Sequence, residues 1–281
     1  MEAARANLQK QHSSIRAKGR VSGWIQTPSS PDPQHNLDAE LVIMTDGPKF
    51  HLQLLHAPQP LATPPQPERL EMAVFDGKNI YSFYSSGGTT RGGVFFEFSQ
   101  SAVLRSTGFP FSTLVNFWDD AITLKELDSR AITLTDLGTH GYIMKEDRAT
   151  YVRQVFMGRE SDLDIERVAL RHPGAAVAFR EHWLKWQKTS DDVRYVEHYV
   201  VRHRYAIKDA PEGQIIARQY EVDFDQFSHD VKHDARSFTL EGIGVPVGTV
   251  FTDYRRNIKG KRALMKWNGT TLDELPETDS P

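Results

Sequence analysis

The sequence contains no cysteine among its 281 residues. This absence excludes disulfide bonds, thiol nucleophiles and thiolate metal sites. The chain also lacks any apolar run near the roughly 18 residues that a membrane-spanning helix requires.

A strong charge bias is also missing. The formal net charge is -3 at pH 7, which gives no electrostatic case for a nucleic-acid partner. Hydrophobic residues make up 39% and charged residues 25% of the chain, a balance typical of a globular protein with a sizeable core. At this length, one large β domain is sufficient, and we expect a single domain spanning residues 1–281.

A recognisable secretory signal is absent as well, because Met1–Arg5 leads directly into a polar segment. Two interpretations remain open. The protein is cytoplasmic, or the chain is the mature part of an exported protein whose signal or lipobox cysteine has been removed.

The clearest positive signal is the stretch Glu68–Gly87. Apolar and polar residues alternate on both sides of Asp76-Gly77, which is the strongest short-range pattern for a β-hairpin. We therefore predict a hairpin with a structural, not a catalytic, turn.

Strand patterns recur along the rest of the chain, with turn residues between them. Two further hairpins are predicted, Leu37–Thr45 with Lys49–Ala57, and Val193–Ile207 with a strand around Ile216–Phe224. The other predicted strands are Arg20–Thr27, Gly93–Ser99, Ala131–Leu137, Tyr142–Lys145, Thr150–Met157, Leu163–Arg171, Val177–Gln187, Phe238–Ile243, Thr249–Tyr254 and Arg262–Trp267. So many strands with few helices between them favour an antiparallel sheet.

Val177–Gln187 is compatible with a strand or a helix, of which we favour the strand, and two other segments have helical periodicity. They are Glu2–Lys18, with a thin apolar stripe, and Phe109–Leu127, with a broad apolar face. Proline-rich loops are expected at residues 28–36 and 58–67, and a flexible tail at 275–281.

Several groups of polar residues have a chemical and a structural interpretation. His229 and His233 are four residues apart, as in some metal sites, but no third ligand or HExxH pattern accompanies them, so a solvated turn is favoured. His198 and His203 have odd spacing on one strand and therefore face opposite sides of the sheet.

Other groups leave the chemistry open. His198 with Arg194, Arg202 and Arg204 forms either an anion-binding patch or an ordinary ion-paired face, and we favour the second. The carboxylates Asp119, Asp120, Asp223 and Asp225 are interpreted as solvated rather than catalytic. Four aromatic residues would suit either a sugar-stacking platform or a core; they are Trp183, Trp186, Tyr195 and Tyr199.

Three stretches resemble the lipoprotein-carrier superfamily of LolA/LolB-like proteins, especially its larger exported members from planctomycete-type bacteria. They are SSIRAKGRVSGWI, in which the first helix ends and passes directly into a strand, VFDGKNIYSFYSSG, and LEGIGVPVGTVFTDYRRN followed by ALMKWNGTTL. Together they span most of the chain from Ala3 to Leu272. The length, the proline-rich loops and a long insertion around residues 130–188 depart from the compact carriers.

The resemblance implies a mainly β (α+β) fold: a curved antiparallel sheet forming an unclosed β-barrel, with the N-terminal and internal helices covering its concave side. It also implies a cavity for a lipid, acyl chain or other apolar ligand, with no enzymatic activity, cofactor or metal. Its residues would be Leu52, Met72, Val74, Tyr84, Phe96, Trp118, Tyr220 and Val222.

The same resemblance implies a location in the periplasm or at the outer membrane, and a membrane-associated or lipoprotein partner. Three other function classes remain open at this point: an envelope hydrolase, a carbohydrate-binding protein, and a scaffold with a vestigial cavity.

Overall fold

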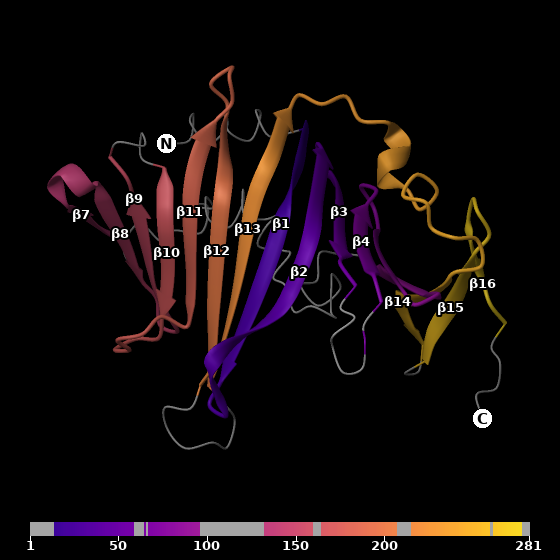
Figure 1. Ribbon diagram of the computed structural model, residues 1–281, viewed down its shortest axis with the longest axis horizontal. Helices are drawn as coiled ribbons and strands as arrows, with labels where there is room; N and C mark the ends of the chain where they lie inside the picture. The colour runs from indigo at the N-terminus through magenta and orange to yellow at the C-terminus, as the bar shows by residue number, and fades with distance from the viewer. Residues whose placement is uncertain are drawn as a thin grey trace. The chain divides into compact units, whose positions relative to one another are not determined.

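The computed structural model describes residues 14–58, 65, 67–95, 132–159, 164–206, 215–258 and 261–276. β-Strands dominate this part of the chain (Figure 1). The strands are β1 (Ser14–Thr27), β2 (Ser30–Asp46), β3 (Lys49–His56), β4 (Arg69–Phe75), β5 (Ile80–Ser86), β6 (Thr89–Phe95), β7 (Ile132–Asp136), β8 (Tyr142–Asp147), β9 (Val152–Met157), β10 (Ile165–Arg171), β11 (Arg180–Lys188), β12 (Arg194–Ala206), β13 (Ile215–His229), β14 (Val250–Ile258), β15 (Lys261–Trp267) and β16 (Leu272–Glu274).

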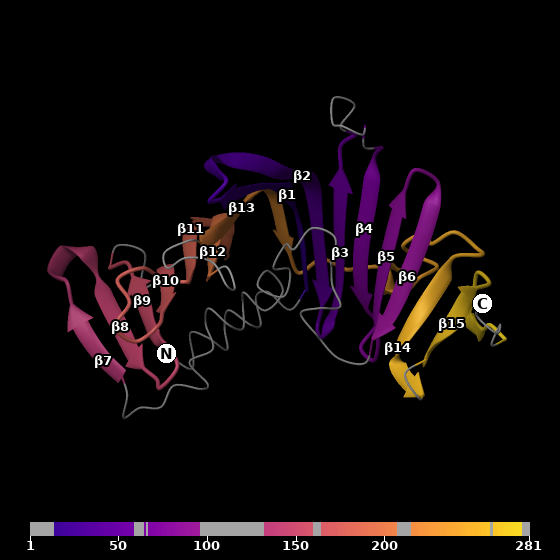
Figure 2. The same ribbon diagram turned by 90° about the horizontal axis from the view of Figure 1, so that it is seen from below.

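The strands hydrogen-bond in one 16-stranded sheet, in the order β16-β15-β14-β6-β5-β4-β3-β2-β1-β13-β12-β11-β10-β9-β8-β7. Because the order ends at β16 and β7, the sheet is not closed within the described residues. The prediction of an antiparallel sheet needs one correction, since β14 pairs with β6 in parallel, with Phe251 opposite Gly92. Figure 2 shows these two strands side by side.

The hairpin at Asp76-Gly77 is confirmed. β4 and β5 pair antiparallel from Arg69↔Ser86 to Phe75↔Ile80. One Asp76 carboxylate oxygen accepts hydrogen bonds of 2.7 Å from the backbone amides of Lys78 and Asn79. Gly77 has a φ of 100°, a conformation that a side chain would disfavour. The residues of the turn thus fix its geometry by local hydrogen bonding.

The other two hairpins are also confirmed. β2 pairs with β3 across Gly47, and β12 pairs with β13 from His198↔Asp223 to Ala206↔Ile215. The segment from Val177 to Gln187, for which a strand was favoured over a helix, contains all of β11 except its last residue, Lys188.

The prediction of a helix over Glu2–Lys18 is wrong for its last five residues. Ser14 is the first residue of β1, and Ile15 and Ala17 alternate with exposed or half-buried neighbours as a strand requires. Their burial on one side of the sheet outweighs the weak helical preference of this segment. Residues 2–13 and the predicted internal helix Phe109–Leu127 lie outside the described residues.

Two further segments differ from the prediction. Residues 30–36, expected in a proline-rich loop, belong to β2, whose pairing with β3 begins only at Ala39. Prolines are tolerated outside such a ladder because they have no N–H to donate. The segment Phe238–Ile243, predicted as a strand, begins with the last residue of the 3-10 turn η4 (Ala235–Phe238) and continues as a bend and turns.

The only helical turns in the described ranges are η4 and η3 (Gly138–His140), both 3-10. No described helix is long and apolar enough to cross a membrane. The described residues divide into two compact units, to both of which β1, β2 and β13 contribute. Unit 1 comprises the described parts of Met1–Lys18, Ala39–Val115 and Gln226–Pro281, and unit 2 those of Gly19–Asp38 and Asn116–Asp225. The expected single domain stays a prediction.

Unit 1 has a core on the side of the sheet that carries Met72, which we call the Met72 face. Phe83 and Phe251 lie on this face, and Leu240 and Val245, from the segment after η4, pack against them. The indole N–H of Trp267 donates to the carbonyl of Val245 at 3.2 Å, which fixes that segment over the sheet.

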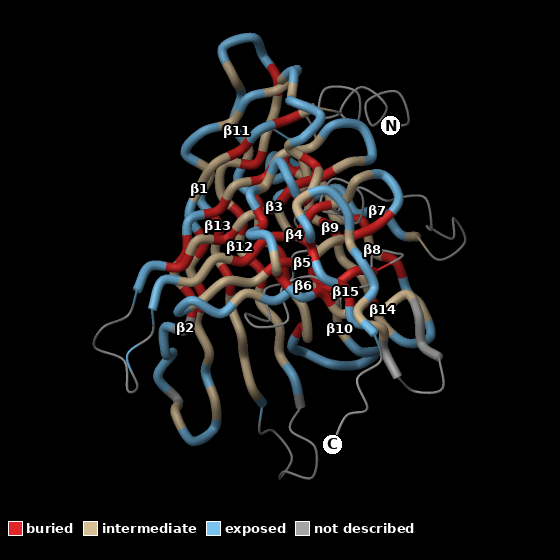
Figure 3. Tube along the Cα trace, turned by 90° about the vertical axis from the view of Figure 1, so that its right-hand side faces the viewer, coloured by how far each residue is buried: buried red, intermediate tan, exposed pale blue. Residues whose placement is uncertain are grey.

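Unit 2 buries one face of β8 to β13. Met144, Val155 and Val168 form a cluster in neighbouring strands, and Val201 and Val222 are fully buried further along the sheet. Figure 3 shows buried positions along the strands and exposed ones at the turns. We call this side of unit 2 the Val201 face and the opposite side the Arg202 face.

Candidate ligand-binding face

The predicted cavity residues of unit 1 do not share one face of the sheet. Leu52 of β3 is directly opposite Ala73, and Tyr84 of β5 is opposite Glu71. Since side chains alternate along β4, Met72 and Val74 point to the other side. Leu52, Met72 and Val74 are each almost completely buried.

The remaining cavity residues fall into two groups. Phe96 and Trp118 lie outside the described residues. Tyr220 and Val222 are two residues apart on β13, both on the Val201 face of unit 2, and both are buried. Their surroundings form the candidate site.

Cross-strand register arranges this part of the Val201 face in rows. One row is Leu184, Tyr199 and Val222, on β11, β12 and β13. The next is His182, Val201 and Tyr220. Directly opposed residues in a sheet contact each other, so the two rows form one apolar and aromatic surface, which we call the apolar rows.

The next row along the same strands is cationic. Arg180 is opposite His203, and His203 is opposite Arg218. These three residues, the cationic row, are all half-buried. The Nε2 atom of His203 and the Nε atom of Arg218 are buried and have no hydrogen-bond partner. Buried polar atoms of this kind are rare in native proteins and call for a specific explanation.

Exposure rises steadily across these rows. Val201, Tyr220 and Val222 are at most 1% exposed, the cationic row is intermediate, and Tyr205, one row further, is 49% exposed. A path from solvent along this face would therefore meet the cationic row before the apolar rows.

Burial also sets the protonation of the site. Burial, together with the positive charges of Arg180 and Arg218, lowers the pKa of His203 to about 3. Burial likewise holds the pKa of His182 well below its usual value. Both imidazoles are therefore neutral near pH 7, and the two guanidinium groups carry the charge of the cationic row.

The tyrosines of the apolar rows stay protonated. Burial raises the pKa of Tyr199 strongly and also raises that of Tyr220. The Tyr199 hydroxyl forms a hydrogen bond of 2.6 Å with Nδ1 of His182. The apolar rows thus contain no charged group near neutral pH.

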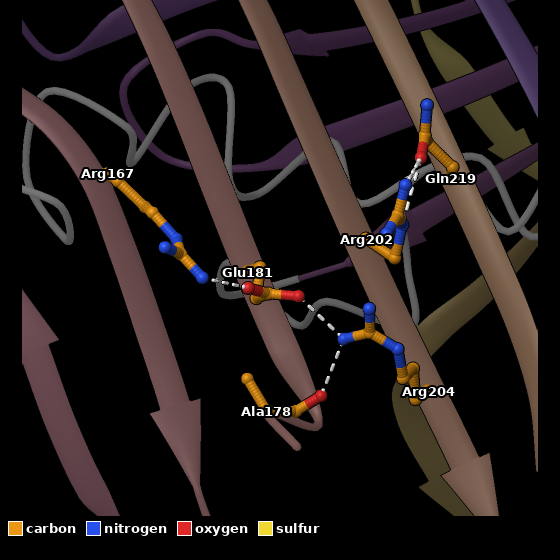
Figure 4. Close-up of polar contacts among 6 residues, drawn as sticks. All are labelled: Arg167, Ala178, Glu181, Arg202, Arg204 and Gln219. Atoms are coloured by element: carbon orange, nitrogen blue, oxygen red, sulfur yellow. Dashed lines mark hydrogen bonds and ion pairs between the residues drawn. The ribbon is translucent and has the colours of Figure 1, made fainter. Parts of the chain in front are cut away.

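The Arg202 face is different in character, because its cations are paired (Figure 4). Glu181 of β11 accepts hydrogen bonds from Arg167 of β10 at 2.5 Å and from Arg204 of β12 at 2.6 Å. Arg202 donates to the side-chain oxygen of Gln219 on β13. Burial alone would raise the pKa of Glu181, but the hydrogen bonds from Arg204 and Arg167 lower it.

These pairs decide between two interpretations of the arginines. On the Arg202 face Arg204 pairs with Glu181 at 2.6 Å, and His198 contacts Asp223 at 2.6 Å. Arg194 pairs with Asp164 at 2.6 Å, but the register shift between Lys185 and Trp186 places Arg194 on the opposite face. The ion-paired face is confirmed in preference to an anion-binding patch.

The aromatic platform is not formed. Trp183 is opposite Val200 on the Arg202 face, between the guanidinium groups of Arg167 and Arg202 at 5.7 and 5.4 Å. Tyr199 is buried on the other face. The four aromatic residues therefore do not present one stacking surface.

The histidines lie as the spacing predicted. His198 and His203 face opposite sides of the sheet, as their different cross-strand rows show. His233 forms a 3.1 Å hydrogen bond with the carbonyl of Ile15, and His229 contacts Asp230, so the two are not brought together as ligands. Asp119 and Asp120 lie outside the described residues.

Sequence patterns missed the cationic row. Arg180, His203 and Arg218 are isolated in the sequence, and each resembles an ordinary charged residue of a half-exposed strand. Only the register of β11 with β12 and of β12 with β13 brings them together. The alternation of Arg218, Tyr220 and Val222 on one side of β13 was a signal that could have indicated a charged end to the apolar face.

Comparison with known proteins gives only distant matches. No protein-family model matches the chain, and no curated protein is similar to it. A lipovitellin structure that describes lipid–protein interactions has 9% identity and a TM-score of 0.30 over 80% of this chain and 26% of its own. MucB, in a crystal structure with MucA(peri), has 8% identity and a TM-score of 0.16 over 82% and 97% of the two chains.

The chain thus spans about a quarter of the lipovitellin chain that it matches. Both TM-scores are below 0.5, so neither similarity carries an argument about fold or function. Membership of the lipoprotein-carrier superfamily stays a prediction.

Proposed function

We propose that this protein binds and carries an amphiphile with an apolar chain and an anionic head group, without catalysing a reaction. The observation that carries the proposal is the cationic row, Arg180, His203 and Arg218, at the border of the apolar rows. An anionic group there would give partners to the buried Nε2 of His203 and Nε of Arg218.

The two parts of the face would contribute differently to binding. Each methylene group transferred from water to the apolar rows would contribute about 0.8 kcal/mol at most. A charge-assisted hydrogen bond to a guanidinium group contributes about 1.5–3 kcal/mol. The length of the ligand's apolar chain would therefore determine most of the affinity. Its head group would determine the orientation of the ligand and the preference for anionic over uncharged ligands.

The gradient of exposure supports an entry direction. Tyr205, beyond the cationic row, is 49% exposed, whereas Val201 and Val222 are fully buried. In this arrangement the chain enters first, and the head group stops at the half-buried cationic row. Carboxylate and phosphate head groups share the required chemistry, and the experiment distinguishes them.

The test is a displacement titration of the full-length protein, with cis-parinaric acid as the fluorescent probe. Oleate, lysophosphatidate and methyl oleate are the competitors. We expect oleate or lysophosphatidate to compete at least about tenfold better than methyl oleate, because the ester has no charge for Arg218 to bind. Saturated acids should gain roughly two- to fourfold in affinity for each added methylene.

Two matched variants locate the site. Arg218→Gln should abolish the preference for the anionic competitor, and Arg218→Lys should retain most of it. Arg202→Gln, on the opposite face beside Gln219, is the control and should bind as the wild type does. No saturable binding of the probe, or a preference that survives Arg218→Gln, would overturn the proposal.

The location in the cell envelope is a separate part of the proposal and rests on the resemblance of the sequence to lipoprotein carriers. Fractionation of the native host into cytoplasm, periplasm and membranes tests it. Recovery in the periplasmic or outer-membrane fraction is expected, and recovery in the cytoplasm alone would contradict it.

A further inference from the structure

A second group of side chains lies on the Arg202 face, outside the proposed ligand site. His198 of β12 is directly opposite Asp223 of β13, and Glu221 precedes Asp223 by two residues on the same side of the strand. The Nδ1 atom of His198 is 2.6 Å from Oδ1 of Asp223, and its Nε2 atom is 3.5 Å from Oε1 of Glu221. One ligand atom from each residue lies within 4.8 Å of the other two.

This arrangement poses a problem of charge. A neutral imidazole has one N–H donor and one lone pair, so it cannot donate to two carboxylates at once. A neutral ring that donates through Nδ1 to Asp223 leaves the lone pair of Nε2 facing the Glu221 carboxylate at 3.5 Å. A metal ion bound between these two groups would replace this unfavourable contact.

We propose that His198, Glu221 and Asp223 bind a divalent first-row transition-metal ion. In a tetrahedral zinc site, bonds of about 2.0–2.1 Å separate the ligand atoms by about 3.3 Å. Only one ring nitrogen of His198 can bind the ion, and one ligand atom from each of the three residues lies within 4.8 Å of the other two. Side-chain rotations that close these gaps by about 1.5 Å would therefore suffice, with the backbone of β12 and β13 unchanged.

The donor set selects the class of ion. An imidazole nitrogen with two carboxylate oxygens suits zinc, manganese, iron, cobalt or nickel, whereas magnesium and calcium prefer oxygen alone. The three side chains are 29%, 31% and 66% exposed for His198, Glu221 and Asp223, so an ion can reach them from solvent.

The surroundings leave room for further ligands. A hollow of about 480 Å³ adjoins the group and is lined by Lys185, Glu197, His198, Asp223, Phe224 and Asp225. Asp225 follows Asp223 on the same side of β13 and offers another oxygen. The one competing cation in the hollow, Lys185, is 2.7 Å from the carboxylate of Glu197, which holds it away from the proposed ligands.

The test uses the metal-free, full-length protein and two probes, Co²⁺ followed by visible absorption and Zn²⁺ followed by calorimetry. We expect one saturable site per chain, and Zn²⁺ should displace Co²⁺. His198→Ala, Glu221→Gln and Asp223→Asn should each lower the affinity at least about tenfold, because loss of even an outer-shell partner costs that much.

His140→Ala is the control, since His140 is exposed on η3 and distant in sequence from the group. It should leave the affinity unchanged. Far-UV circular dichroism of each variant establishes that the fold is intact. Absence of saturable binding, or binding that all three substitutions leave unchanged, would overturn the proposal, and neither result bears on lipid binding.

Discussion

The guanidinium group of Arg255 donates a hydrogen bond of 2.8 Å to the side-chain oxygen of Asn79, a residue 176 positions earlier. Asn79 in turn donates to the hydroxyl of Tyr81, which donates to Asp76 in the turn between β4 and β5. Arg255 also forms a bidentate pair with Asp253, both distances being 2.9 Å, and the Asp253 side chain is fully buried. The turn and β14 are thus joined by one polar network.

Replacement of Arg255 by Met should destabilise the protein by about 3 kcal/mol, because it removes a partner of the buried Asp253 carboxylate. The free energy of unfolding, measured by urea titration, reports the change. The matched control is Arg20→Met, which breaks the pair of Arg20 with Asp38, where the arginine side chain is 68% exposed. Exposed pairs contribute about 0–1 kcal/mol, so equal effects of the two substitutions would contradict the assigned role of Arg255.

Replacement of Glu181 by Gln should cost about 2–4 kcal/mol, since it leaves Arg167 and Arg204 without their shared carboxylate. The Glu181 side chain is only 8% exposed. Lys185→Gln is a control on the same strand, because its pair with Glu197 is largely exposed. Urea titration of both variants checks the prediction, which fails if Glu181→Gln is as mild as the control.

Gly92 has no room for a side chain. A Cβ atom on it would lie 2.1 Å from the Phe251 ring, on the neighbouring parallel strand. Gly92→Ala should therefore destabilise unit 1 by about 1–3 kcal/mol through overpacking. Phe251→Leu removes part of the ring, so the double variant should be more stable than the sum of the two single effects predicts. Additive effects in thermal unfolding would contradict this packing.

Stability should fall as the pH decreases from about 6.5 to about 5, at up to about 1.4 kcal/mol per pH unit for each histidine that stays neutral in the folded state. Burial lowers the pKa of His51 to about 4 and that of His203 to about 3. In this window the unfolded chain binds more protons than the folded one, so acid favours unfolding.

His203→Gln should reduce this slope, because the variant has one titrating group fewer. His140→Gln, at an exposed position, should leave the slope as it is in the wild type. Urea titrations at pH 5, 5.75 and 6.5 measure it, and comparison of each variant with the wild type removes the shared contribution of carboxylates, which titrate mostly below about pH 5. A slope unaffected by His203→Gln would refute the prediction.

Local signals predicted much of this fold because its hairpins are local structures. Asp76, Gly77 and the alternation on either side of them define a turn without help from the rest of the chain. The long strands β12 and β13 were predicted for the same reason. The mainly β character and most of the strand positions followed from such segments.

The secondary-structure predictions are wrong where contacts between residues distant in the sequence determine the structure. Ser14 to Lys18 belong to a strand because Ile15 and Ala17 are buried by the sheet, although the local pattern favours a helix. Residues 30–36 extend β2 because a strand can contain proline where no partner needs its amide. The parallel pairing of β6 with β14 also has no local signal.

The candidate site was only partly predictable. Tyr220 and Val222 were chosen for their alternation, and the structure places both on one buried face. Leu52 and Met72 were predicted from the same alternation, but they lie on opposite faces of the sheet. The face on which each side chain lies depends on the register of β3 against β4, which one sequence does not specify. The cationic row and the group around His198 depend on two registers at once.

The pairing of β6 with β14 has a consequence for the order of folding. During synthesis β6 leaves the ribosome 159 residues before its partner, which is the separation of Thr90 and Thr249, two residues that share a hydrogen bond. Until β14 is made, the outer edge of β6 has unpaired amides and carbonyls, and the Met72 face lacks Phe251. Unit 1 is therefore completed only once β14 has been synthesised, and a nascent chain that ends before Val250 exposes an unpaired strand edge with which another chain can pair.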